Sequence, residues 1–99
     1  MLNITKNTNE TELTVGLIGR LDTTTAPELE KELKASLDSV TTLVIDMTAL
    51  DYISSAGLRV LLSAQKTMNK QGEMKVVHVN ETIMEIFEVT GFADVLTIQ

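Results

Sequence analysis

The first twenty residues alternate apolar and polar side chains with a period of two. Residues 2–5 and 13–18 show this alternation, and the turn-forming run NTNE at residues 7–10 separates them. A period of two is typical of a strand with one buried face. The pattern therefore predicts an antiparallel β-hairpin at the start of the chain.

A helical pattern follows and begins near Ala26. Thr25 and Glu28 have the spacing of a capping box, and Pro27 is tolerated in a first turn because the N–H groups there have no intrahelical partner. The apolar residues that come next recur every four positions: Leu29, Leu33 and Leu37. This spacing predicts an amphipathic helix with one buried stripe.

Two more helices are predicted in the second half of the chain. Residues 58–68 carry apolar side chains on a broad helical face, and Gly72 is a candidate C′ residue after them. Residues 81–90 follow Asn80, a suitable N-cap, and end at Gly91. We expect Met84 and the other apolar residues of this last helix to belong to the core.

Short apolar strands are predicted between and after these helices, at residues 43–47, 74–79 and 95–98. The order is strand, strand, helix, strand, helix, strand, helix and short strand. This alternation predicts a single α/β domain over residues 1–99, with right-handed parallel crossovers after the hairpin. We expect a mixed sheet of four to five strands with the helices packed mainly on one face.

Composition and charge narrow the functional classes. The chain has 99 residues, which is enough for one domain, and a formal charge of −6, which disfavours binding to nucleic acid or to an anionic membrane surface. It has no cysteine, and no apolar run approaches the roughly 20 residues of a membrane span. We therefore expect a cytoplasmic protein whose partner is another protein or a small molecule.

Catalytic and metal chemistry find little support in the sequence. A serine nucleophile needs a nearby base, and the single histidine, His78, lies in a predicted apolar strand. Ser55 does not stand in a Gly-x-Ser-x-Gly pattern, and neither EF-hand spacing nor a phosphate-binding glycine loop is present. We predict no catalytic residue, no metal and no cofactor.

The serine pair Ser54-Ser55 is the candidate functional site, because it lies where a polar turn becomes an apolar helical run. One interpretation is that a serine simply caps the helix. Asp22 lies at the exit of another strand, and such exits often share one edge of an α/β sheet. Asp22 either caps the turn of Thr23 and Thr24 or belongs to a site with the serines, and the local sequence favours neither interpretation.

Residues at this candidate site and elsewhere resemble the STAS family, and within it the stand-alone bacterial anti-sigma factor antagonists. The similarity extends over nearly the whole chain. It is carried by Gly19-Arg20-Leu21-Asp22 followed by Thr25 and Ala26, by Leu43-Val44-Ile45-Asp46-Met47, by Tyr52-Ile53-Ser54-Ser55-Ala56-Gly57-Leu58, and by Gly91-Phe92.

The resemblance implies a partner switch controlled by phosphorylation. In this family the unphosphorylated protein binds an anti-sigma factor that is also a GHKL-type serine kinase, and a PP2C-type phosphatase reverses the modification. The phosphorylated serine of the family corresponds to Ser55, with Ser54 as second choice. Ser54 occupies a position where many members have aspartate.

A phosphate at this position suits the local physics, because a helix N-terminus favours the added charge of about −1.5 to −2. Leu58 is either a core residue or an exposed apolar anchor for the partner, and the resemblance favours the second. We expect Ala56 and Gly57 to keep the approach to Ser55 open. The predicted partner-binding residues are Asp22, Thr23, Thr24, Ser54, Ala56, Gly57, Leu58 and Arg59.

The expected state is a monomer or a weak dimer. A different interpretation of the same fold is a scaffold or sensor module in a larger regulatory assembly, which could bind a nucleotide.

Overall fold

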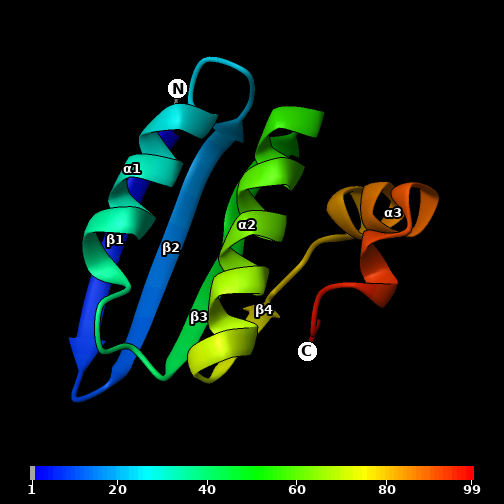
Figure 1. Cartoon of the computed structure of the whole chain (residues 1–99). Coiled ribbons are helices and arrows are strands. Elements are labelled where there is room, and N and C mark those ends of the chain that lie inside the picture. The colour runs from blue at the N-terminus through cyan, green and yellow to red at the C-terminus, as the bar shows by residue number, and fades with distance from the viewer. Residues whose placement is uncertain (1) are drawn as a thin grey trace.

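Within residues 2–99, which the computed structural model describes, four strands form one mixed sheet in the order β1, β2, β3, β4. β1 (Leu2–Asn9) and β2 (Glu12–Leu21) form the predicted antiparallel hairpin. β3 (Thr42–Ile53) runs parallel to β2, and β4 (Glu73–Val77) runs parallel to β3. The prediction of an α/β domain with a mixed sheet is confirmed (Figure 1).

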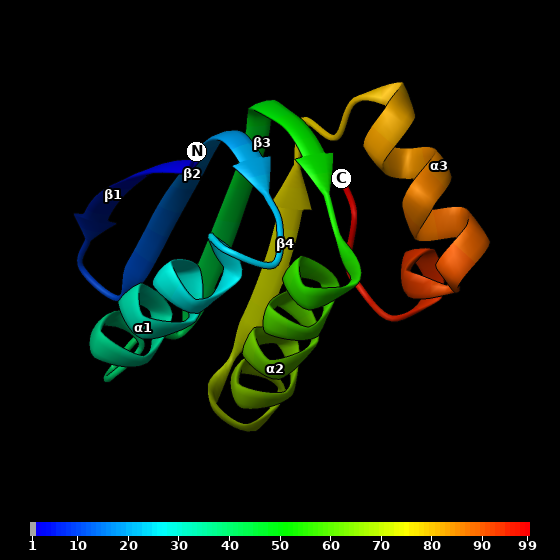
Figure 2. The same cartoon turned by 90° about the horizontal axis from the view of Figure 1, so that it is seen from above.

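α1 (Ala26–Ser36) and α2 (Ser55–Gln71) cover the same face of the sheet, as Figures 1 and 2 show. The core lies between these helices and the inward side chains of β2, β3 and β4, and it consists mainly of Leu, Ile, Val and Met. None of the helices in the described residues is long and apolar enough to cross a membrane.

β3 has 12 residues and extends well beyond the predicted range of 43–47. Its inward residues are spaced by two at first and then by three: Leu43, Ile45, Met47, Leu50 and Ile53. The change follows from two shifts of register against β2, one between Gly16 and Ile18 and one between Gly19 and Arg20. Each shift places one extra residue in β3, as in a β-bulge, and so interrupts the period of two.

α3 (Glu81–Thr90) lies beside the second half of β3, beyond the point where β4 ends (Figure 2). Asn80 connects the two elements: its Nδ2 donates to the carbonyl oxygen of Leu50 at 2.9 Å, and its Oδ1 accepts from the backbone N–H of Ile83 at 2.8 Å. The predicted N-cap is therefore confirmed. Asn80 also satisfies a carbonyl that the short β4 leaves without a strand partner.

The face of α3 that points away from the sheet is not part of the core. Ile83 and Phe87 are fully buried, whereas Met84 and Ile86 are only partly buried and Val89 is 82% exposed. Met84 and Ile86 still pack against the core, so the prediction that Met84 and the other apolar residues of this helix belong to the core is wrong only for Val89. A single helix can bury only one stripe against the sheet, and α3 has apolar residues on more than one side.

The C-terminal segment contributes less sheet than predicted. The short 3₁₀ helix η1 (Phe92–Asp94) precedes it, and a single parallel bridge between Val76 and Ile98 replaces the predicted strand at 95–98. The backbone N–H of Val76 donates to the carbonyl oxygen of Thr97 at 2.8 Å. The end of the chain thus covers part of the free edge of β4.

Gly72 ends α2 for a reason that differs from the predicted one. Its φ of 169° is extended, so it is not a left-handed C′ residue. A Cβ atom at this position would lie 1.8 Å from the carbonyl oxygen of Thr41, so only glycine permits this approach of the two backbones. Gly91, by contrast, ends α3 with a φ of 83°, as predicted.

Candidate functional site

The ends of β2 and β3 bring the candidate site residues together. Leu21 and Ile53, the last residues of the two strands, are paired across the sheet. The backbone N–H of Ser54 donates to the carbonyl oxygen of Leu21 at 2.9 Å. Asp22 and Ser54 therefore leave the sheet side by side, as expected for the exits of neighbouring parallel strands.

Asp22 organises the turn that leads into α1. Its Oδ1 accepts hydrogen bonds from the backbone N–H of Thr24 at 3.0 Å, from the hydroxyl of Thr24 at 2.8 Å and from the backbone N–H of Thr25 at 3.1 Å. The Thr24 hydroxyl and these N–H groups lower the pKa of the Asp22 carboxyl below its usual value. Asp22 therefore caps this turn and carries a negative charge beside the serines.

Thr25 does not form the predicted capping box with Glu28. It occupies the N-cap position of α1, but its side chain makes no capping hydrogen bond. Its hydroxyl instead donates to the carbonyl oxygen of Arg20 at 2.8 Å and accepts from the backbone N–H of Asp22 at 2.8 Å. Thr25 is buried, and it ties the turn back to β2 rather than capping the helix.

The two serines have different roles at the start of α2. Ser54 is the N-cap, and its Oγ accepts from the backbone N–H of Gly57 over a long distance of 3.4 Å. Ser55 is the first residue of the helix and is exposed. Its hydroxyl has no hydrogen-bond partner in the described part of the chain. The prediction that Ser54 caps the helix is confirmed, and the Ser55 hydroxyl is accessible to solvent.

Gly57 and Leu58 differ from the sequence prediction. Leu58 is 5% exposed and belongs to the core, so the expectation of an exposed anchor is wrong. Gly57 is also buried, and a Cβ atom there would lie 2.7 Å from Leu21 Cγ and 2.9 Å from Ile53 Cγ1. This glycine allows α2 to approach the sheet closely, and it does not keep the surface around Ser55 open.

A hollow of about 180 Å³ lies between the first turns of α1 and α2. Three predicted partner-binding residues line it: Thr23, Ala56 and Arg59. Four residues without a predicted role complete it: Ala26, Pro27, Glu30 and Val60. The sequence did not indicate these four, because the hollow depends on how the two helices sit against each other.

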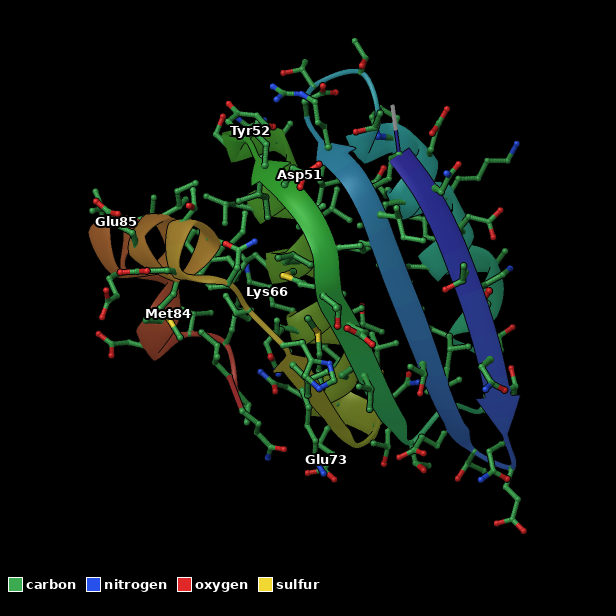
Figure 3. All side chains as sticks on the ribbon, turned by 180° about the vertical axis from the view of Figure 1, so that it is seen from behind. Asp51, Tyr52, Lys66, Glu73, Met84 and Glu85 are labelled. Atoms are coloured by element: carbon green, nitrogen blue, oxygen red, sulfur yellow. The ribbon has the colours of Figure 1, made fainter. Side chains whose placement is uncertain are left out.

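Arg20 and Tyr52 form a second feature that the sequence did not indicate. They are paired across β2 and β3, and the Arg20 guanidinium lies 4.3 Å from the centre of the Tyr52 ring. Arg20 Nε also lies 3.9 Å from Asp22 Oδ2. Tyr52 is 37% exposed near the end of β3 (Figure 3). Arg20 and Tyr52, which neighbour each other across the two strands, therefore supply a cation and an aromatic ring next to Asp22.

His78 does not serve Ser55 as a base. It follows the end of β4 with a φ of 58°, is exposed, and its Nδ1 lies 3.1 Å from Asp46 Oδ1. Asp46 precedes Ser54 by eight residues of extended chain, which corresponds to roughly 20 Å or more. Within residues 2–99, no group of three or more acidic or histidine side chains is arranged to hold a metal ion.

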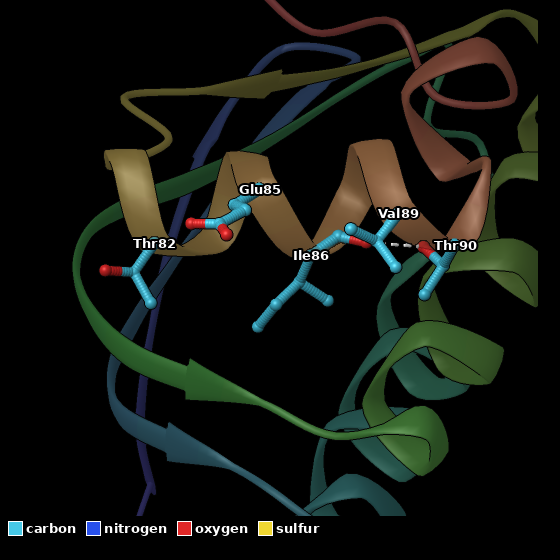
Figure 4. Close-up of a pocket in the computed structure, with 5 residues that line it drawn as sticks. All are labelled: Thr82, Glu85, Ile86, Val89 and Thr90. Carbon is cyan, nitrogen blue, oxygen red and sulfur yellow. Dashed lines mark hydrogen bonds between the residues drawn. The ribbon is translucent and has the colours of Figure 1, made fainter.

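A larger hollow of about 360 Å³ lies along α3 and includes none of the predicted site residues. Its lining is Thr82, Glu85, Ile86, Val89 and Thr90, and the Thr90 hydroxyl donates to the carbonyl oxygen of Ile86 at 2.7 Å (Figure 4). The lining combines the apolar side chains of Ile86 and Val89 with the polar side chains of Thr82, Glu85 and Thr90. The chemistry of the molecule is concentrated instead at the ends of β2 and β3.

Comparisons with known proteins point to one protein family. The model of the STAS domain matches residues 3–99. The candidate anti-sigma factor antagonist BtrV of Bordetella bronchiseptica is 38% identical over 84 residues, which cover 83% of this chain and 72% of that protein. The anti-sigma-B factor antagonist of Bacillus subtilis is 29% identical over 98 residues, which cover 98% and 90%.

A solved structure of an anti-sigma factor antagonist has the same fold as this chain. The crystal structure of an anti-sigma factor antagonist from Mycobacterium paratuberculosis superimposes with a TM-score of 0.89 and 25% identity, covering 99% of this chain and 85% of that one.

Proposed function

The chain belongs to the STAS domain family, and from this premise we propose that it is an anti-sigma factor antagonist switched by phosphorylation of Ser55. The unphosphorylated protein binds an anti-sigma factor that is also a GHKL-type serine kinase, and the sigma factor is released. Phosphorylation of Ser55 ends this binding, and a PP2C-type phosphatase restores it. The protein itself performs no catalysis.

The accessibility of the Ser55 hydroxyl is the observation that carries this proposal. Ser54 supplies the N-cap, so Ser55 is not needed for capping and can react without exposing an unsatisfied helix end. The first turn of α2 also favours a negative charge, by roughly 0.3–1 kcal/mol for an exposed group. The fold should therefore tolerate a phosphate on Ser55 with little change in stability.

The modification is an ordinary phosphoryl transfer from ATP. The γ-phosphorus forms a bond to Ser55 Oγ while its bond to the oxygen bridging it to the β-phosphorus breaks. ADP leaves, and the hydroxyl proton passes to a base of the kinase. Ser55 contributes only the accepting oxygen, so the chain needs no catalytic base of its own.

The effect on binding follows from the charges around Ser55. Asp22 already places a carboxylate at the exit of the neighbouring strand, and its lowered pKa keeps it ionised. A phosphate adds about −1.5 to −2 charges to the same surface. A partner surface that accommodates Asp22 alone would then face like-charge repulsion and an uncompensated loss of solvation.

Mapping the phosphorylation site tests the proposal directly. The chain is incubated with ATP and each GHKL-type serine kinase of its source cell, and the products are digested and analysed by mass spectrometry. We expect phosphate on Ser55 in the wild type and in Ser54→Ala, and none in Ser55→Ala. Ser63→Ala, which alters an exposed serine of the same helix, is the matched control. A product modified on neither Ser54 nor Ser55 would contradict the proposal.

A charge substitution tests the switch separately from the modification. Ser55→Asp should weaken kinase binding on the order of 100-fold, which corresponds to about 3 kcal/mol. Its free energy of unfolding should stay close to that of the wild type, because an acidic residue is favourable in a first helical turn. Kinase affinity of Ser55→Asp equal to that of the wild type, measured by calorimetry, would rule out an electrostatic switch.

A further inference from the structure

Arg59 lies on the same helix as Ser55 and is a candidate ion-pair partner for a phosphate on Ser55. Ser55 and Arg59 lie four residues apart in α2, and both side chains are exposed. Side chains at this spacing share one face of a helix, with Cβ atoms about 5–6 Å apart. A guanidinium on a three-carbon stem therefore reaches the space that the phosphoryl group of a modified Ser55 would occupy.

Arg59 is available for such a contact. Among the described residues 2–99 it makes neither an ion pair nor a side-chain hydrogen bond. Arg20, the other arginine of the chain, is already engaged by the Tyr52 ring at 4.3 Å and by Asp22 at 3.9 Å. Arg59 is thus the arginine that can respond to a new anion at the start of α2.

We infer that Arg59 binds the phosphoryl group of phosphorylated Ser55 in an ion pair within α2. The inference rests on the proposed function, since it concerns the state that phosphorylation produces. The planar guanidinium can donate two parallel hydrogen bonds to phosphate oxygens. An anion placed four residues before a cation is also the favourable order along a helix.

The charged groups near the start of α2 make this pair important. Asp22 in the turn before α1 and Glu30 on α1 both repel a phosphate, and Glu30 lines the same hollow as Arg59. Arg59 offsets this repulsion, because Arg20 is already engaged by Asp22, with its Nε 3.9 Å from Asp22 Oδ2. The modified chain therefore retains a stable first turn of α2 despite its added charge.

The pair also changes the surface beside Ser55. In the unmodified protein the Arg59 side chain lines the hollow between α1 and α2, together with Thr23 and Ala56. Binding to the phosphate draws the guanidinium towards the helix N-terminus. Phosphorylation then removes a cation from the hollow in addition to placing an anion next to it, so one modification alters the predicted partner surface at two points.

The full-length chain with phosphoserine encoded at position 55 tests this inference without a kinase. The phosphate is titrated by ³¹P NMR in chains that carry Arg59, Arg59→Gln or Arg59→Lys. We expect Arg59→Gln to raise the proton affinity of the phosphate about threefold, because a cation one turn away favours the dianion. Arg59→Lys, which keeps the charge without the planar fork, should give an intermediate value.

Lys66→Gln is the matched control, since Lys66 is an exposed cation on the same helix and lies eleven residues from Ser55. It should leave the phosphate titration unchanged. Equal titrations with Arg59 and with Arg59→Gln would overturn the inference, and so would an equal shift in Lys66→Gln. Because phosphoserine is introduced during translation, this result does not depend on whether any kinase modifies Ser55, and the two proposals can fail separately.

Discussion

Contacts with Thr48 and His78 lower the pKa of the Asp46 carboxyl on β3. Its Oδ1 accepts from the Thr48 hydroxyl at 2.6 Å and from the Thr48 backbone N–H at 2.9 Å, and His78 Nδ1 lies 3.1 Å away. These contacts, the Thr48 hydroxyl first, lower the pKa of Asp46 below its usual value. The ionised carboxylate is therefore favoured more in the folded chain than in the unfolded one.

The lowered pKa of Asp46 leads to a prediction about acid stability. A depressed folded-state pKa stabilises the fold fully above the unfolded value of about 4, and this contribution is lost as the pH falls through the lower folded value. Asp46→Asn should therefore lower the Tm at pH 5–7, and the difference from the wild type should shrink below about pH 4.

Thermal denaturation from pH 2.5 to 7 measures this difference. Asp51→Asn is the matched control, because Asp51 is an exposed carboxylate of the same strand (Figure 3). A Tm difference between Asp46→Asn and the wild type that stays constant over this range would contradict the assignment.

Gly57 fixes the distance between α2 and the sheet. Gly57→Ala would place a methyl group 2.7 Å from Leu21 Cγ, and Leu21 is fully buried and cannot move aside freely. Overpacking of this kind costs about 1–3 kcal/mol, and the better helix propensity of alanine offsets up to about 1 kcal/mol of it. We expect a net loss of roughly 1–2 kcal/mol in urea denaturation. A variant as stable as the wild type would show that α2 can shift, and Ser63→Ala serves as the control.

At the scale of the elements, the N-caps of α2 and α3 differ in strength. The Ser54 cap is a single 3.4 Å hydrogen bond, whereas the Asn80 amide caps α3 at 2.8 Å and also bonds Leu50 of β3 at 2.9 Å. Asn80→Ala should therefore cost about 2 kcal/mol in the free energy of unfolding and Ser54→Ala only about 0.5 kcal/mol. Urea denaturation of the two variants compares them, and the reverse ranking would contradict these geometries.

The helices were predictable because their start signals are local. Ser54 and Asn80 precede apolar runs, and each caps the helix that follows it. The capping box at Thr25 failed because Asp22, three residues earlier, accepts from the N–H of Thr25, and because the Thr25 hydroxyl bonds the Arg20 carbonyl oxygen instead of the N–H of Glu28. This arrangement depends on how the turn folds back on Arg20, which residue spacing does not encode.

The second half of β3 was not predictable from periodicity. Its inward residues are spaced by three because of the register shifts against β2, so the strand signal ends at Met47. The location of the candidate site was predictable, because the ends of β2 and β3 and Ser55 lie where the sequence indicates. The burial of Leu58 and Gly57, and the Arg20 to Tyr52 contact, depend on packing between distant segments and could not be read from the sequence.

At the scale of the whole molecule, the sheet has one face without helices (Figure 3). Its outward side chains on β1 and β2 are mainly polar, among them Asn3, Thr5, Asn7, Thr14 and Arg20. Ile18, which is 42% exposed, is the large apolar side chain on the outward face of these two strands, and it supplies far less apolar area than a stable dimer buries. The formal charge of −6 also makes two copies repel each other.

We therefore expect the purified chain to sediment as a monomer of 10.9 kDa at concentrations of about 10–100 μM. Sedimentation velocity at low and at high salt measures this state. A stable dimer that persists at low salt would show that a surface other than the polar sheet face mediates association.

The two extra residues of β3 have a consequence for how this molecule can vary. The number of residues between Met47 and Ile53 sets the position of Ser55 relative to Asp22. Each extra residue lengthens β3 without adding a pair to the ladder with β2. Substitutions at the exposed positions 48, 49 and 51 should therefore be neutral for phosphorylation. Removal of one of these residues would rotate the start of α2 and displace the acceptor hydroxyl, so the length of this segment constrains the site more than its composition does.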